Sequence, residues 1–173
     1  MTKELRKMKK FRFQLLHDWI VEHVKPCRVA DIGGGKGLLT LLLNKDGFQS
    51  VVIDPYSQTL PTKYKSLGGV RHKISDNITV PGMGKAFEKE MAKDFDLLLG
   101  LHAHGSNMKI IEAVAEYKKD FVLLPCCVID EPIVPQANIN WFDSLEEYAN
   151  KLGIKTKRFE LNFRGQNKGF YSL

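Results

Sequence analysis

Short apolar runs alternate with amphipathic stretches along the chain. Between residues 11 and 24, apolar side chains recur about one helical turn apart, which predicts a leading helix. Compact apolar runs then predict five strands, at residues 27–32, 50–55, 70–74, 95–101 and 121–129. The stretches between and after these strands predict helices at residues 37–44, 106–119 and 143–153, and a turn followed by a short helix at 81–94.

The order of these elements predicts an α/β fold. Strands that alternate with helices favour a doubly wound, mostly parallel sheet with helices on both faces. Residues 154–163 and 168–173 predict two more strands joined by the turn RGQN, and this C-terminal hairpin adds an antiparallel strand. We therefore expect a seven-stranded sheet in a single domain over residues 1–173, with a basic tail at 1–10 and the leading helix at 11–25.

Positive charge is concentrated at both ends of the chain. The net charge is +6, and residues 1–12 and 151–173 each hold six Lys or Arg and one acid, around a mildly acidic body. This distribution favours an anionic partner such as nucleic acid. The alternative is that the terminal lysines only keep the protein in solution.

Cysteine usage and hydropathy indicate the compartment. The three cysteines, Cys27, Cys126 and Cys127, do not make a disulfide framework, which is typical of a reducing environment. No apolar run approaches the roughly 20 residues of a membrane helix. The charged N-terminus is not followed by the apolar segment of a secretion signal. We expect a cytoplasmic protein without a membrane partner.

A glycine-rich segment, DIGGGKGL at residues 31–38, follows the first predicted strand. It is not a P-loop, because the first glycine of that motif and its Ser or Thr after Gly-Lys are both missing. It fits a dinucleotide motif poorly, because Leu38 stands where the last small residue belongs. S-adenosylmethionine fits best, since glycines let its amino-acid part lie close to the backbone. The cofactor-binding glycines would be Gly33, Gly35 and Gly37.

Three acids come at the ends of successive predicted strands. Asp31 would reach the amino group of the cofactor through water or the loop, and Asp54 would accept hydrogen bonds from the ribose hydroxyls. Asp76 would bind the adenine amino group, and Leu101, at the end of the fourth strand, would also contact the cofactor. The alternative for each acid is a helix cap or a turn residue.

The motif DIGGGKGLLT resembles the first motif of the Rossmann-fold, class I S-adenosylmethionine-dependent methyltransferases, and the general resemblance covers nearly the whole chain. The segment GLHAHG at 100–105 and the later cysteine pair are similar to one branch, the methyltransferase-like proteins and tRNA 2′-O-methyltransferases. That branch has a GLHxCG segment, and His104 stands here in place of its cysteine. The resemblance implies S-adenosylmethionine as cofactor and an RNA substrate.

Two histidines are the candidate catalytic residues. His102 and His104 would lie on one side of an extended segment, where an imidazole can act as general base. The alternative is that His102 packs near the cofactor and His104 faces solvent. Cys126 and Cys127 are either nucleophiles or, more commonly for cysteines that end an apolar strand, core residues. By ligand type, His102 and His104 with Cys126 or Cys127 could hold a metal, but their spacing is not that of a known zinc motif, so we expect no metal.

The long segment at residues 128–142 is expected to lie over the acceptor side of the sheet. Trp141 or Phe142 would either stack on a base or pack as a hydrophobic staple for the next helix. The polar side chains placed to touch an acceptor are Asp130, Glu131, Asn138 and Asn140.

Sheet topology also predicts where the basic ends meet. The turn before the final antiparallel strand and the start of the leading helix are both expected at the carboxyl edge of the sheet. Lys7, Lys9, Lys10 and Arg164 would then flank one entrance. The sequence thus favours an S-adenosylmethionine-dependent methyltransferase that acts on RNA. The alternatives are methylation of a small molecule or protein, and a non-catalytic subunit that binds RNA or a protein partner.

Overall fold

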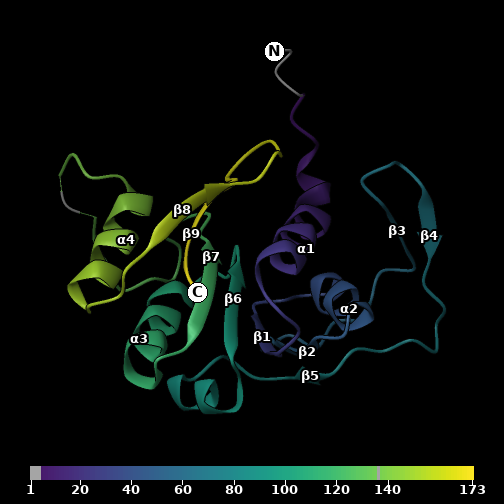
Figure 1. Cartoon of the computed structure of the whole chain (residues 1–173), viewed down its shortest axis with the longest axis horizontal. Coiled ribbons are helices and arrows are strands. Elements are labelled where there is room, and N and C mark those ends of the chain that lie inside the picture. The colour runs from purple at the N-terminus through teal and green to yellow at the C-terminus, as the bar shows by residue number, and fades with distance from the viewer. Residues whose placement is uncertain (1–4, 136) are drawn as a thin grey trace.

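The computed structural model describes residues 5–135 and 137–173, and these form one mostly parallel sheet with helices against it (Figure 1). The order of the seven strands is β5-β2-β1-β6-β7-β9-β8. The first five are parallel, β9 runs antiparallel to β7, and β8 runs antiparallel to β9. Their bounds are β1 (Arg28–Ile32), β2 (Gln49–Ile53), β5 (Gly82–Met83), β6 (Leu97–Leu101), β7 (Asp120–Leu124), β8 (Lys157–Glu160) and β9 (Lys168–Ser172).

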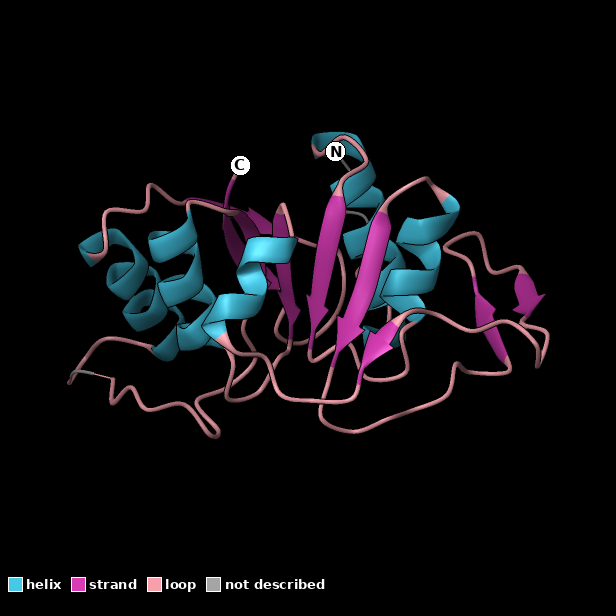
Figure 2. Cartoon of the chain, turned by 90° about the horizontal axis from the view of Figure 1, so that it is seen from below, coloured by secondary structure: helices cyan, strands magenta, loops and turns pink. Residues whose placement is uncertain are grey.

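The helices lie on both faces of the sheet, as Figure 2 shows. One face is covered by α1 (Arg12–His23) and α2 (Leu38–Lys45), which contact each other. The other is covered by α3 (Asn107–Tyr117) and α4 (Trp141–Lys151), with the short 3-10 helix η2 (Lys89–Asp94) beside α3. A further 3-10 turn, η1 (Lys9–Phe11), leads into α1. The doubly wound α/β fold predicted from the sequence is confirmed.

Alternation along the central strands divides the core into two layers. Leu97 and Leu99 of β6 pack in the cluster that includes Leu16 of α1. Leu98, between them, packs in the opposite cluster with Ile110 of α3. All five side chains are fully buried, which explains why the inner strands read as continuous apolar runs.

The predicted third strand at residues 70–74 is not part of this sheet. The segment forms β4 (Arg71–Lys73), which pairs antiparallel with β3 (Lys63–Lys65) in a separate hairpin. The place beside β2 is taken by β5 instead. All three residues of β4 are exposed, and two are charged, so the segment is too polar for a strand packed on both faces. The prediction failed because β5 has only two residues and shows no pattern of its own.

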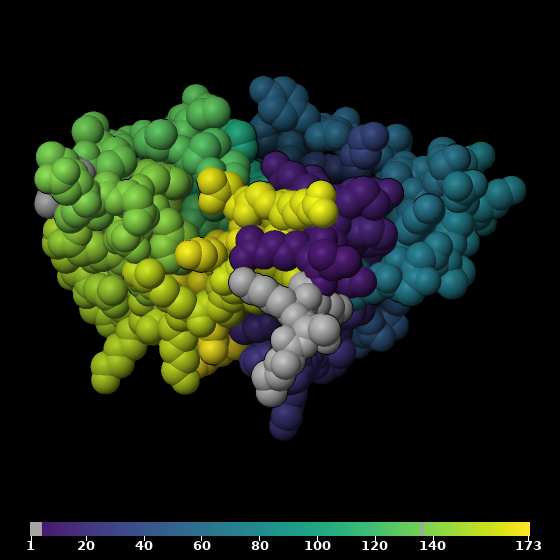
Figure 3. All heavy atoms as spheres, turned by 90° about the horizontal axis from the view of Figure 1, so that it is seen from above, coloured from purple at the N-terminus to yellow at the C-terminus, as the bar shows by residue number. Residues whose placement is uncertain are grey.

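The basic N-terminal segment lies against the C-terminal hairpin. Lys7 forms an isolated parallel bridge with Phe163, its N–H donates to Asn162 O at 3.0 Å, and its carbonyl accepts from Arg164 N at 2.9 Å. Figure 3 shows the purple segment that begins at residue 5 beside the yellow C-terminal hairpin on one face. The predicted meeting of the basic ends is therefore confirmed, although residues 1–4 of the predicted tail lie outside the described residues. Within the described part of the chain, every helix is too short or too polar to cross a bilayer.

Candidate cofactor and acceptor sites

The glycine loop leaves β1 with a backbone that side chains would obstruct. Gly33 has φ +66°, and a Cβ there would lie 3.1 Å from Ala103. Gly35 also has a left-handed φ, of +55°. A Cβ on Gly34 would meet the Asp31 side chain at 2.7 Å. Glycine is needed here for conformation and for close approach.

Gly37 has a different role from the other two predicted glycines. It is the N-cap of α2 with φ +78°, and a Cβ there would meet Val80 at 2.7 Å and Val52 at 3.2 Å. Its lack of a side chain allows α2 to begin close against β2 and the segment before β5. The close packing of α2 therefore explains why residue 37 is a glycine.

Asp31 lies beneath the loop rather than at its surface. It is 1% exposed and accepts a hydrogen bond from Thr40 Oγ1 at 2.9 Å. Its pKa is raised to about 6, chiefly by burial; hydrogen bonds from Thr40 oppose the shift and the charge of Asp54 adds to it. With a pKa of about 6, Asp31 is mostly ionised at pH 7. A positive charge bound above the loop would lower this pKa and favour the ionised form.

Asp54 joins the end of β2 to the glycine loop. One carboxylate oxygen accepts from Gly35 N at 3.0 Å, and the other accepts from Tyr56 N at 2.8 Å. Each oxygen keeps a second acceptor position. The carboxylate lines a hollow of about 200 Å³ together with Met83, the last residue of β5, and Gly84, which follows it.

A larger hollow of about 800 Å³ lies over the other side of the glycine loop. Gly33, Leu101, His102 and His104 line it, so the predicted contact residue Leu101 and both candidate bases share one cavity. The two hollows have Gly35, Lys36 and Gln58 in common. Together they form a path from Asp54, across the loop, to the carboxyl end of β6.

The wall of the larger hollow is strongly basic. None of the described residues that line it is Asp or Glu. The turn η1, the helix α1, the glycine loop and the β3–β4 hairpin all contribute cations. These are Lys9, Lys10, Arg12, Lys36, Lys63, Lys65 and Arg71.

Asp76 is not brought to this path. Because residues 70–74 are not a strand of the main sheet, Asp76 does not stand at the carboxyl edge as predicted. It is exposed and lines a neighbouring hollow of about 430 Å³ with Ile74 and Ile78, and this hollow meets the other two only at its margin, where it shares Gln58 with both. The strand end in the corresponding position is that of β5, where Met83 and Gly84 line the hollow beside Asp54.

Gln14 of α1 is a lining residue that the sequence analysis missed. Its side chain is 6% exposed, and its Nε2 donates to Lys65 O at 2.6 Å, which ties α1 to the β3–β4 hairpin. Its Oε1 is buried without a hydrogen-bond partner among the described residues. Such an acceptor is suited to a donor on a ligand. A glutamine inside an amphipathic helix carries no sequence signal of this role.

His102 is held in an unusual backbone conformation at the end of β6. Its φ is +56°, a left-handed value rare for a residue with a side chain, and its N–H donates to Leu124 O at 3.0 Å. Its ring Nε2 lies 2.9 Å from Gln166 O, an acceptor, so Nε2 carries the proton and Nδ1 is left to accept. Burial is the main cause that lowers its pKa, so the ring is neutral at pH 7.

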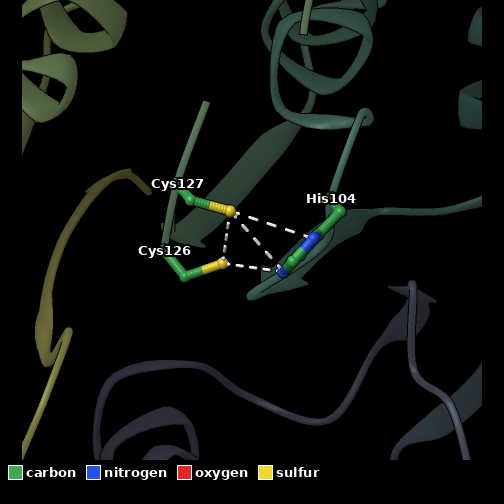
Figure 4. A group of neighbouring side chains, drawn as sticks. All are labelled: His104, Cys126 and Cys127. Carbon is green, nitrogen blue, oxygen red and sulfur yellow. Dashed lines mark hydrogen bonds between the residues drawn. The ribbon is translucent and has the colours of Figure 1, made fainter. Parts of the chain in front are cut away.

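His104 and the two cysteines meet at the carboxyl edge. Figure 4 shows the three side chains pointing toward one another from two separate segments. Cys126 Sγ lies 3.0 Å from His104 Nε2 and 3.4 Å from Cys127 Sγ. Both cysteines are half-buried, beyond the last core residue of β7, Leu124, so the core interpretation does not describe them.

The segment after β7 uses its polar residues mainly to fix helix ends. Asn140 is the N-cap of α4 and accepts from Asp143 N at 3.0 Å. Glu131 binds the first turn of α3 through both carboxylate oxygens. Asp130 and Asn138 are exposed residues with left-handed φ.

Phe142 and Trp141 pack inward. The Phe142 ring lies edge-on to Phe170 at 5.5 Å, and both Trp141 and Phe142 pack against the core cluster beneath α3 and α4. Inward packing argues against stacking on a base, and because both residues follow the N-cap Asn140 they are core contacts of the first turn of α4 and not a staple from before the helix.

Comparisons with known proteins agree with this architecture. No family model matches the chain. In sequence it is similar to a probable tRNA (uracil-O(2)-)-methyltransferase of Caenorhabditis elegans, with 33% identity over 147 residues, 77% of this chain. A protein of the same description from Caenorhabditis briggsae is 33% identical over 103 residues, 60% of this chain. The chain spans only 25% and 18% of the length of these two relatives.

Solved structures share the fold at low sequence identity. The PH0226 protein of Pyrococcus horikoshii OT3 aligns with 92% of this chain and 87% of its own, with TM-score 0.55 and 13% identity. The SAM-dependent methyltransferase of Agrobacterium tumefaciens aligns with 95% and 62%, with TM-score 0.54 and 11% identity. The ribosomal protein L11 methylase of Lactobacillus delbrueckii subsp. bulgaricus aligns with 96% and 80%, with TM-score 0.52 and 13% identity. The chain therefore has the Rossmann-like fold of class I methyltransferases, as its first motif predicts.

Proposed function

We propose that this chain, which has the class I methyltransferase fold, binds S-adenosylmethionine and transfers its methyl group to tRNA. The two relatives at 33% identity are named as tRNA methyltransferases, and the chain corresponds to a part of them. The basic wall of the 800 Å³ hollow is the observation that carries the RNA assignment. The three cysteines are free, which suits the reducing cytoplasm that we propose as its location.

The residues around the glycine loop fit the proposed cofactor. Asp54 keeps free acceptor positions for two ribose hydroxyls, beside a loop whose glycines leave room for close approach. Asp31 provides negative charge beneath the loop for the amino group above it. S-adenosylmethionine, when bound, supplies a methyl group on a positively charged sulfur.

The acceptor end of the path holds groups that can take a proton. A hydroxyl acceptor must lose its proton as it is methylated, and a neutral imidazole can accept it. His102 is neutral at pH 7 and has Nδ1 free as acceptor. His104 lines the same hollow and is the second candidate.

Polyanion binding is supported by where the cations lie. Seven Lys or Arg line one cavity, and they come from η1, α1, the glycine loop and the β3–β4 hairpin. Arg164 is joined to Lys7 through the backbone, and Lys9 lies beside Gly165. Lysine and arginine side chains around a tRNA entrance bind phosphates, and such binding weakens steeply with salt.

The test compares two double charge reversals. Lys9→Glu with Lys10→Glu changes the entrance. Lys25→Glu with Lys155→Glu changes exposed residues before β1 and β8, at the amino edge of the sheet, and alters the net charge equally. Each protein is titrated into unmodified tRNA at low and moderate salt, and transfer of labelled methyl groups from S-adenosylmethionine is measured.

We expect the entrance variant to bind tRNA about tenfold or more weakly, with a shallower salt dependence, and the control to bind like wild type. Digestion of the tRNA product then locates the methyl group, because a 2′-O-methyl blocks alkaline cleavage of the adjacent bond. Binding of the cofactor without tRNA affinity at low salt would instead support a small-molecule or protein acceptor. RNA binding without cofactor affinity would support a non-catalytic subunit.

A further inference from the structure

We propose that His104, Cys126 and Cys127 form a zinc site with one open coordination position. The three residues come from the turn after β6 and the segment after β7, and their ligand atoms all lie within 4.8 Å of one another. One imidazole and two thiols are the donors that zinc prefers, and magnesium and calcium prefer oxygen. The proposal concerns metal binding and stands independently of the methyl-transfer reaction.

The distances between donors are close to those of a tetrahedral ion. Zinc bonds of about 2.3 Å to sulfur and about 2.05 Å to nitrogen place two sulfurs about 3.8 Å apart, and sulfur about 3.6 Å from nitrogen. The observed distance between the sulfurs of Cys126 and Cys127 is 3.4 Å. His104 Nε2 lies 3.0 Å from Cys126 Sγ and 3.7 Å from Cys127 Sγ. Small rotations of the side chains would open a tetrahedral face.

His104 Nε2 is the ligand atom that this geometry selects. It lies within 3.7 Å of both sulfurs. Nδ1 is close only to Cys127, at 3.8 Å, and would leave Cys126 outside the set. Zinc bound to Nε2 leaves Nδ1–H as a donor, which is the usual state of a metal-bound imidazole.

Two contacts hold the ligand-bearing segments together. Glu131, four residues after Cys127, accepts from Asn107 N at 2.7 Å and Met108 N at 3.2 Å, in the first turn of the helix that follows His104. Gly105 has φ +69°, and a Cβ there would lie 3.0 Å from Asp130 Cβ. The turn and the segment are therefore packed backbone to backbone on either side of the ligands.

The fourth coordination position would face the cavity. His104 lines the 800 Å³ hollow, and the protein supplies only three ligands from the described cluster. A three-ligand zinc site typically keeps a water or a substrate oxygen in its fourth position. A metal there would be exposed to an oxygen-bearing ligand that enters over the glycine loop.

The test measures zinc binding to the full chain by chelator competition, with cobalt as a spectroscopic probe. Zinc binding displaces the two thiol protons, and cobalt bound to thiolates absorbs in the near ultraviolet. We expect one zinc per chain and a thiolate band with cobalt. Cys126→Ser and His104→Ala should each weaken zinc binding by about 100-fold or more.

Cys27→Ser is the matched control. Cys27 is the remaining cysteine, half-buried beside the cluster under α1, and should leave zinc affinity unchanged. Alkylation of the cysteine pair should slow when zinc is added. The proposal is overturned if wild type loses zinc to a weak chelator, if Cys126→Ser binds as tightly as wild type, or if zinc leaves alkylation unchanged. The last two results would indicate that the thiol pair holds no metal.

Discussion

The two ends of the ligand path are built in different ways. At the cofactor end, the backbone itself provides the surface: glycines with left-handed φ leave the loop bare, and Asp54 braces it through Gly35 N. At the acceptor end, side chains from two segments converge, and a third residue, Glu131, holds those segments in place. A backbone site tolerates few substitutions at its glycines. A side-chain site depends on residues far apart in the chain. We therefore expect substitutions at the two ends to have different effects, on cofactor affinity at one end and on stability at the other.

The largest expected effect is loss of cofactor affinity in Asp54→Ala. Hydrogen bonds to a charged group contribute about 1.5–3 kcal/mol each, so losing two ribose contacts should weaken S-adenosylmethionine binding by about 100-fold or more. Calorimetric titration measures this, with circular dichroism to check folding. Asp76→Ala is the matched control, because Asp76 lines neither of the two hollows beside the glycine loop. An equal loss in the Asp76 variant would show that this acid reaches the cofactor after all.

A second substitution should damage the acceptor end alone. Ser106, the N-cap of α3, makes no side-chain cap, and Glu131 binds the helix N-terminus instead. Glu131→Ala should therefore cost about 2 kcal/mol of unfolding free energy, a factor of about 30, from lost capping hydrogen bonds. Urea denaturation measures the change.

Glu147→Ala serves as the control for that experiment. Glu147 makes an i, i+4 ion pair with Lys151 on the surface of α4, and its loss should cost about 0.5 kcal/mol or less. Affinity for S-adenosylmethionine should stay unchanged in Glu131→Ala if the two ends are independent. A parallel loss of cofactor binding would show that the acceptor end supports the glycine loop.

The smallest effect is a pH dependence that belongs to the cofactor end. The pKa of Asp31 is raised to about 6 in the free protein, and a bound positive charge favours the ionised form. Cofactor affinity should thus be nearly constant above pH 7 and fall by about tenfold between pH 7 and pH 5, because Asp31 must lose its one proton before it can attract the positive charge. In Asp31→Asn this slope should disappear.

The same shift has the opposite consequence for the unliganded fold. The folded pKa of Asp31 exceeds its unfolded value of 3.8, so the folded state binds the extra proton between about pH 4 and 6. Stability from this group is present below that window and is lost as the pH rises through it. Asp31→Asn should therefore gain stability over wild type at pH 8 but not at pH 4, as thermal unfolding at both values would show.

The central strands and the cofactor loop were predictable because their signals are local. Continuous burial makes β6 and β7 apolar throughout, and the glycine segment follows β1 directly. The strand beside β2 was missed because Gly82 and Met83 are too few residues to give a recognisable pattern. Residues 71–73 were predicted in its place, but they form an exposed strand of the separate hairpin.

The acceptor end was not predictable in the same way. His104 and Cys126 are 22 positions apart and meet only because β6 and β7 are parallel neighbours. Glu131 caps a helix that begins 24 positions before it in the chain. The sequence around Ser106 contains no pattern that predicts this contact. Pairing across strands, rather than spacing along the chain, determined which side chains share this site.

The bridge between Lys7 and the C-terminal hairpin also implies that this part of the structure forms late during synthesis of the chain. Arg6 and Glu160 form an ion pair although 154 positions separate them. On a translating ribosome, β1, β2 and the glycine loop can emerge and pack long before residue 160 is added. The basic rim of the entrance is complete only when the late-made hairpin captures the early-made segment. A nascent chain would thus complete the glycine loop of the proposed cofactor site before the basic rim of the proposed tRNA entrance is assembled.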